Sequence, residues 1–176
     1  MLGSRLIPYL RERGYRVFCF SRKDRDGDDN VQIDTNSDSS LGQALDACQP
    51  SIIINSAALT DVDLCERYPH QAYVSNVSVV EKLSHWIKDN RSCHLIQIST
   101  DHNYDGNGPH TESNIKIINH YGFSKYAGEI AALSVNATVL RTNFFGKSLC
   151  PGRQSFSDWS FYALKRGKNI SLYEDV

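Results

Sequence analysis

The sequence Ser51-Ile52-Ile53-Ile54-Asn55 decides the predicted fold. A run of branched apolar residues between polar ends indicates a strand that is buried on both faces, as in a parallel sheet. His94–Ser99 is a second run of this kind, and the stretch from Pro69 to Lys88 between them carries apolar side chains at helical spacing. A strand, a helix and another strand in this order predict a parallel βαβ unit.

The same alternation continues on both sides of this unit. Further strands are predicted at Tyr15–Phe20, Val31–Asp34, Thr138–Arg141 and Ile170–Tyr173. Further helices are predicted at Leu2–Arg13, Leu41–Cys48, Tyr121–Leu133 and Phe156–Lys165. The sequence therefore predicts an α/β fold in which helices cover both faces of a parallel sheet.

The composition excludes several classes of protein. The chain has 176 residues, 40% of them hydrophobic and 22% charged, with a net charge of -1. This balance argues against nucleic acid or an anionic membrane surface as the main partner. No apolar run reaches the length of a membrane span, and the first residues lack the core of a signal peptide, so we expect a cytoplasmic protein.

The cysteines and histidines do not form a recognisable ligand pattern. The five cysteines are widely spaced without a C-x-x-C pair, and the six histidines lack the H-E-x-x-H spacing. Cys19 and Cys93 lie in apolar runs, where buried, reduced thiols are expected. We therefore predict no metal site.

Tyr121 and Lys125 form the pair that carries the predicted chemistry. Residues four apart on a helix share a face, so the ammonium is expected near the phenol. Bringing a tyrosine pKa from about 10 to about 7 takes roughly 4 kcal/mol. One positive charge at about 4 Å in a partly shielded site supplies about that much, although desolvation opposes it. Such a tyrosine can exchange a proton with a carbonyl or alcohol, but an exposed surface pair is the alternative for this motif alone.

Two predicted strands end in residues suited to a ligand site. Ser99 and Thr100 close one strand, and Ala57 and Ala58 follow another. Ligands of open α/β sheets bind beyond the carboxyl ends of the strands. A hydroxyl there can hydrogen-bond a substrate carbonyl, and small side chains let a flat cofactor approach the backbone. Ordinary turns at the strand ends are the alternative reading.

Four blocks in this order resemble the dTDP-4-dehydrorhamnose reductase family, the sugar-nucleotide 4-ketoreductases among the extended short-chain dehydrogenase/reductases. They are Asn55–Glu66 (N-A-A-x-T-x-V-D-x-x-E), Ser99–Gly106 (S-T-D-x-x-(F/Y)-D-G), Tyr121–Glu129 (Y-G-x-(S/T)-K-x-x-G-E) and Leu140–Asn143 (L-R-T). The resemblance implies a Rossmann-like, doubly wound sheet that binds a nicotinamide cofactor and passes hydride to a ketone of a sugar nucleotide.

The resemblance also implies roles for individual residues. Tyr121 is the proton donor, Lys125 lowers its pKa and binds the nicotinamide ribose, and Thr100 is the hydroxyl partner. Other cofactor positions are Gly3 at the phosphate-binding turn, Asp34 near the adenine, Ala57, Ala58, and Asn76, the helix asparagine that supports the site. Thr60, Val62 and Phe144 match positions on the sugar-nucleotide side.

The residues after the second strand of the nucleotide fold indicate which cofactor is used. Arg22 and Lys23 stand where an acidic residue would accept the ribose 2′-hydroxyl of NAD and a basic one the 2′-phosphate of NADP. We therefore favour NADP over NAD, although Asp24 weakens the distinction.

The start of the chain departs from the family pattern. Gly3 matches the third glycine of G-x-x-G-x-x-G, and the preceding strand and two glycines are not in this sequence. We expect residues 1–150 to form an incomplete cofactor domain that lacks its first strand, and 151–176 to begin a truncated substrate-binding region. Such a chain is expected to bind the cofactor poorly.

Three alternatives to a sugar-nucleotide 4-ketoreductase of surface-polysaccharide or deoxysugar synthesis stay open. The first is a non-catalytic NADP-binding subunit, like the regulatory subunit of methionine adenosyltransferase. The second is a sugar-nucleotide epimerase or dehydratase, which shares the Tyr–Lys pair. The third is a remnant without function. A homodimer is retained as the candidate assembly.

Overall fold

The computed structural model describes residues 2–21, 29–33, 38–90, 92–148 and 154–171. The chain divides into two compact units. The larger comprises residues 18–105 and 110–142, and the smaller comprises residues 1–17, 106–109 and 143–176. Each unit is considered by itself below.

The larger unit contains two parallel sheets. One has the order β3-β4-β5, with β3 at Ile52–Asn55, β4 at His94–Ser99 and β5 at Ala137–Arg141. The other pairs β1 (Cys19–Ser21) with β2 (Asn30–Gln32). The parallel sheets confirm the predicted fold class, and five strands are found among the described residues.

The environment of β3 differs from the prediction. The isoleucine run predicted a strand buried on both faces, but β3 ends its sheet and pairs only with β4 among the described strands. Ile52 is therefore 51% exposed, and Ile53 and Ile54 are half-buried. The isoleucines retain the composition of an inner strand, while β3 has a strand partner along only one edge among the described residues.

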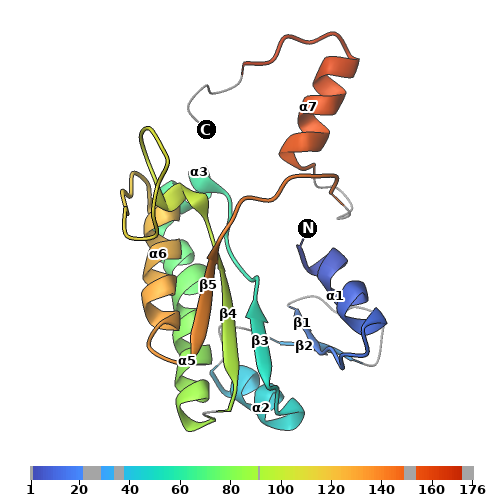
Figure 1. The fold of residues 1–176 in the computed structure, drawn as a ribbon, viewed down its shortest axis with the longest axis vertical. Helices are drawn as coiled ribbons and strands as arrows, with labels where there is room; N and C mark the ends of the chain where they lie inside the picture. Colours follow the sequence, from blue (N-terminus) through green and yellow to red (C-terminus); the bar gives the residue numbers. More distant parts are fainter. Residues whose placement is uncertain (1, 22–28, 34–37, 91, 149–153, 172–176) are drawn as a thin grey trace. The chain divides into compact units, whose positions relative to one another are not determined.

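Helices of the larger unit cover one face of the three-stranded sheet. Figure 1 shows α5 (Val79–Asp89) and α6 (His120–Ala132) side by side along this sheet. Val80, Leu83 and Leu95 lie at the centre of the core between them, at 0 to 5% exposure. Because strand side chains alternate between faces, Leu140 on β5 lies on the other face and is 46% exposed.

The helix predicted from Pro69 to Lys88 is divided into three parts. α4 (Pro69–Tyr73) continues through one π-helical turn, η1 (Val74–Ser78), into α5. The remaining elements of the larger unit are α2 (Asp38–Cys48), α3 (Val62–Arg67) and the short 3₁₀ turn η2 (Asp101–Asn103). A π turn inserts one extra residue into a helix and often lies at a functional site.

The described residues of the smaller unit form two helices. α1 spans Leu2–Glu12, and α7 spans Phe156–Lys165, close to the predicted bounds. A capping box begins α7, in which Ser155 and Asp158 satisfy each other's backbone N–H groups. The strand predicted at Ile170–Tyr173 is not formed at Ile170 or Ser171, and its last two residues lie outside the described ranges.

Candidate active site

Polar residues at the ends of β3 and β4 meet because these strands are parallel neighbours. Asn55 is buried, and its Nδ2 donates to Gln97 Oε1 at 2.8 Å. Its Oδ1 accepts from the Ala57 N–H at 3.2 Å, which ties the residues after β3 to the end of the strand. Ala57 is exposed and Ala58 is half-buried at the carboxyl edge of the sheet.

Thr100 begins the turn η2 directly after β4. Its side-chain oxygen accepts from the His102 N–H at 3.2 Å, so it caps the turn, and the residue is 4% exposed. The same hydroxyl lies close to the phenol of Tyr121 on α6, whose pKa it lowers. The structure therefore brings together two of the three residues predicted to be catalytic.

The helix α6 carries both Tyr121 and Lys125. Its first turn is capped by Asn119, whose Oδ1 accepts from the Gly122 N–H at 2.7 Å. Tyr121 is 8% and Lys125 is 4% exposed, so the pair is buried and the alternative of an exposed surface pair is excluded. The ammonium of Lys125 donates to the Ile98 backbone oxygen at 2.6 Å.

The pKa of Tyr121 differs in direction from the prediction. Burial raises this pKa above its ordinary value of 10.0, and the hydrogen bond from Thr100 opposes that rise. Asp101 and Cys65 add smaller effects in the direction of burial. The expected lowering by Lys125 is not found: Lys125 is not among the groups that shift this pKa, and desolvation of the phenol is the largest effect. A raised pKa keeps the phenol protonated at neutral pH, which is the form that donates a proton.

Lys125 is expected to make stability depend on pH. Burial lowers its pKa from 10.5 to about 8, and Glu129 partly opposes this. Because the unfolded chain binds more protons between these values, the free energy of unfolding should rise as pH increases from about 8 to 10.5. A pKa difference of this size corresponds to about 3 kcal/mol.

The measurement is urea unfolding at several pH values in the parent chain and in Lys125→Met. The variant lacks the titrating ammonium, so its free energy of unfolding should not show this rise. Loss of the bond to the Ile98 oxygen lowers the variant's stability equally at every pH. A constant difference between the two proteins across the range contradicts the prediction.

Asn76 lies in the π turn and connects two parts of the site. Its Oδ1 accepts from the Leu59 N–H at 2.7 Å, and its Nδ2 donates to the Leu59 oxygen at 3.0 Å and to Ser124 Oγ at 2.9 Å. Ser124 Oγ in turn donates to the Tyr121 backbone oxygen at 2.9 Å. Asn76 therefore fixes the loop after β3 against the first turn of α6, rather than being only a polar position on an apolar helix face.

The other predicted site residues lie in different parts of the chain. Val62 is half-buried and packs against the cluster of Cys65, Ala72 and Tyr121, whereas Thr60 is exposed. Gly3 and Phe144 belong to the smaller unit, where Gly3 lies within α1 and Phe144 is 41% exposed. The remaining predicted positions, Arg22, Lys23 and Asp34, lie outside the described residues.

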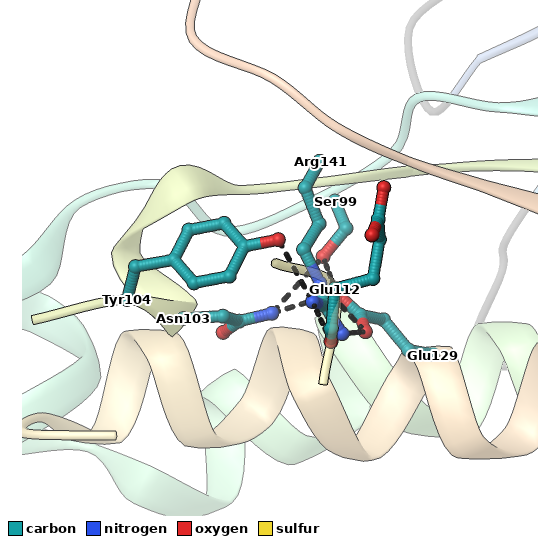
Figure 2. Close-up of polar contacts among 6 residues, drawn as sticks. All are labelled: Ser99, Asn103, Tyr104, Glu112, Glu129 and Arg141. Carbon is teal, nitrogen blue, oxygen red and sulfur yellow. Dashed lines mark hydrogen bonds and ion pairs between the residues drawn. The ribbon is translucent and has the colours of Figure 1, made fainter. Parts of the chain in front are cut away.

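A buried polar cluster next to the site was not predicted. Figure 2 shows Glu129 of α6 bonded to Ser99, Asn103 and Arg141. Glu129 was only part of a quoted motif, although its place four residues after Lys125 puts it on the same helix face. That spacing could have indicated a third functional position.

No helix among the described residues is both long and apolar enough to cross a bilayer. No three histidine, cysteine or acidic side chains in the same ranges lie close enough together to hold a metal ion.

Two proteins of related sequence are reductases by name. The chain is 31% identical to a probable low-salt glycan biosynthesis reductase, Agl14, of Haloferax volcanii, over 99% of this chain and 61% of the relative. It is 33% identical to a dTDP-4-dehydrorhamnose reductase of Aggregatibacter actinomycetemcomitans, over 83% of this chain and 49% of the relative. The chain thus spans about half to three-fifths of the length of these relatives.

Solved structures of similar fold lead to the same family. A hypothetical dTDP-4-dehydrorhamnose reductase from Sulfolobus tokodaii has a TM-score of 0.75 and 27% identity, and the match covers 93% of this chain and 59% of that one. The dTDP-4-dehydrorhamnose reductase of Bacillus anthracis in complex with NADP has a TM-score of 0.67 and 28% identity, with 80% and 49% covered. The family model described as RmlD substrate binding domain matches residues 1–175. The chain therefore belongs to the RmlD family, to which the resemblance to dTDP-4-dehydrorhamnose reductases had pointed.

Proposed function

We propose that this chain contributes the cofactor-binding part, residues 1–150, of an NAD(P)H-dependent reductase of the 4-keto group of a nucleotide-linked deoxysugar, in surface-polysaccharide or deoxysugar synthesis. The observation that carries the proposal is the buried contact between Thr100 and Tyr121, with Lys125 on the same helix face. This group lies at the carboxyl edge of a parallel sheet, where nucleotide cofactors bind. The names of the relatives, a glycan biosynthesis reductase and a dTDP-4-dehydrorhamnose reductase, support a reductase function.

The residues around Lys125 fit a nicotinamide cofactor. An ammonium has three N–H donors, and the Ile98 oxygen is the acceptor recorded for it among the described residues. The other donors suit the paired hydroxyls of a ribose. Exposed Ala57 and half-buried Ala58 leave the strand end open to a flat ring. A bound reduced nicotinamide would supply hydride to the ketone carbon.

The side chains of this site would transfer a proton to the ketone oxygen. Tyr121 would donate its phenolic proton to the ketone oxygen as charge develops there. The Thr100 hydroxyl, close to the phenol of Tyr121, would hydrogen-bond the same oxygen and hold it in place. Asn76 would keep the helix carrying Tyr121 against the loop after β3.

We propose NADP rather than NAD as the cofactor. Arg22 and Lys23 provide the positive charge that a 2′-phosphate requires, and the Bacillus anthracis relative was solved with NADP. Thr60, Val62 and Phe144 are the positions proposed for the sugar-nucleotide side. We place the reaction in the cytoplasm, because reduced nicotinamides and nucleotide-linked sugars are made and used there.

The proposed activity is tested by following NADPH consumption with a 4-keto-6-deoxy sugar nucleotide. Turnover that requires both compounds, with the 4-hydroxy sugar as product, is the expected result. An altered sugar formed without net consumption of NADPH would indicate an epimerase or dehydratase instead. Stoichiometric capture of a partner enzyme by a chain that reduces no sugar would favour the regulatory alternative.

We also propose a homodimer formed through α6. Phe123 and Ile130 are 59% and 58% exposed on this helix, and they border an apolar groove that Val77 and Ala127 also line. Apolar side chains gathered in this way are typical of an association surface. Sedimentation equilibrium should give twice the chain mass, and Phe123→Glu with Ile130→Glu should give the single mass. A parent chain that sediments as a monomer rules the dimer out.

A further inference from the structure

A buried ion pair lies beside the proposed catalytic group without being part of it. Glu129 is 1% exposed and meets the Arg141 guanidinium of β5 through two parallel bonds, with Nη2 at 2.6 Å from Oε2 and Nε at 3.0 Å from Oε1. Arg141 Nη1 also donates to the Tyr104 hydroxyl at 2.9 Å and to the Glu112 backbone oxygen at 2.7 Å. Figure 2 shows these groups converging above α6.

The carboxylate of Glu129 also accepts hydrogen bonds from the turn after β4, on both sides of Thr100. Ser99 Oγ donates to Oε1 of Glu129, and Asn103 Nδ2 donates to the same atom at 2.6 Å. Ser99 directly precedes Thr100, and Asn103 ends the turn η2. The segment that carries the catalytic hydroxyl is therefore attached at both ends to one buried charge.

This arrangement is not explained by stability alone. A buried ion pair gives up the hydration of both charges, and apolar side chains of similar size often stabilise a fold as well or better. A charged acceptor also fixes the orientation of the groups bonded to it, because each oxygen holds several donors in fixed positions. One face of α6 carries Tyr121, Lys125 and Glu129, which follow one another at intervals of four residues. The proton donor, the ammonium and the residue that anchors the opposite turn therefore lie on the same helix face.

We propose that Glu129 is a positioning residue that fixes the turn from Ser99 to Asn103 and so holds the Thr100 hydroxyl against Tyr121. The catalytic consequence rests on the reductase function proposed above. The structural part does not, because it concerns only the order of this turn in the free protein.

Hydrogen exchange of backbone amides tests the structural part directly. In Glu129→Gln, the amides of His102 and Tyr104, which close the turn by bonding to Thr100 Oγ1 and the Asp101 oxygen, should exchange at least tenfold faster than in the parent. The amide of Leu95, bonded to the Asn136 oxygen within the core, should change much less. Leu83→Ala serves as the control, because it weakens the core away from the turn.

A second variant covers the case in which Glu129→Gln does not fold. That change leaves the Arg141 guanidinium buried without its counter-ion, so Glu129→Gln with Arg141→Met removes both charges together. The same local acceleration at His102 and Tyr104 is expected in the double variant. In the control Leu83→Ala, exchange at Leu95 should accelerate as much as at His102 and Tyr104. The same equal acceleration in the Glu129 variants would mean that Glu129 only stabilises the fold, and it would overturn the proposal.

The catalytic part has its own measurement. With NADPH and a 4-keto sugar nucleotide, Glu129→Gln should lower kcat at least tenfold and leave the KM for the sugar nucleotide within twofold, because the reacting groups lose alignment rather than binding contacts. An unchanged kcat in an active parent would refute this part. A parent without any turnover would count against the reductase function, while the exchange data would still decide whether Glu129 orders the turn.

Discussion

Replacing Tyr121 with phenylalanine is expected to lower kcat by about 10³-fold, which is within the range that a general acid contributes. The phenol is the group in contact with Thr100, and its raised pKa keeps the proton available near pH 7. Phenylalanine fills the same buried space but has no proton to give, so hydride addition to the ketone loses the group that stabilises the developing charge. NADPH oxidation with a 4-keto sugar nucleotide measures this loss.

Two comparisons separate this effect from damage to the fold. The Tyr121→Phe variant should lose only about 1 kcal/mol of unfolding free energy, the usual value of one hydrogen bond, and should bind NADPH as the parent does. Tyr73→Phe makes the same chemical change on the neighbouring helix α4, where the hydroxyl donates to Glu81 at the surface, and should leave turnover unchanged. Turnover by Tyr121→Phe within tenfold of the parent would remove Tyr121 from the role of proton donor.

Features that depend on local sequence were predictable. β4 has the predicted bounds, His94–Ser99, and α7 has the predicted bounds, Phe156–Lys165. The i, i+4 spacing of Tyr121 and Lys125 likewise predicted that both lie on one face of a helix. These signals are local, because a few neighbouring residues determine each of them.

Features that depend on distant partners were not predictable from the sequence alone. The π turn forms where Asn76 bonds to Leu59 and Ser124, and Ser124 lies 48 residues away in the chain. The lowered pKa of Lys125 follows from burial, which the i, i+4 spacing does not reveal. The exposure of Ile52 depends on which strands pair with β3. In each case the deciding interaction joins segments that no periodicity relates.

Gly128 shows the same dependence on a distant partner, and its substitution by alanine is expected to have the largest effect on stability. A Cβ at this position would overlap the Asn76 backbone oxygen and lie 3.6 Å from Val80 Cγ2. The obstacle is backbone, so α6 and η1 must separate, which also strains the bonds that Asn76 makes with Leu59 and Ser124. We expect a loss of about 3 kcal/mol of unfolding free energy, despite the higher helix propensity of alanine.

The matched control for Gly128→Ala is Gly42→Ala in α2, where a Cβ meets no atom within 4 Å. The same chemical change in an open helical position should raise the free energy of unfolding by about 0.5 to 1 kcal/mol, since alanine restricts the unfolded chain and favours the helix. Urea unfolding of both variants gives the two values with opposite signs. If Gly128→Ala were as stable as Gly42→Ala, α6 would not pack closely on the π turn. The contact that places Tyr121 beside the loop after β3 would then lose its physical basis.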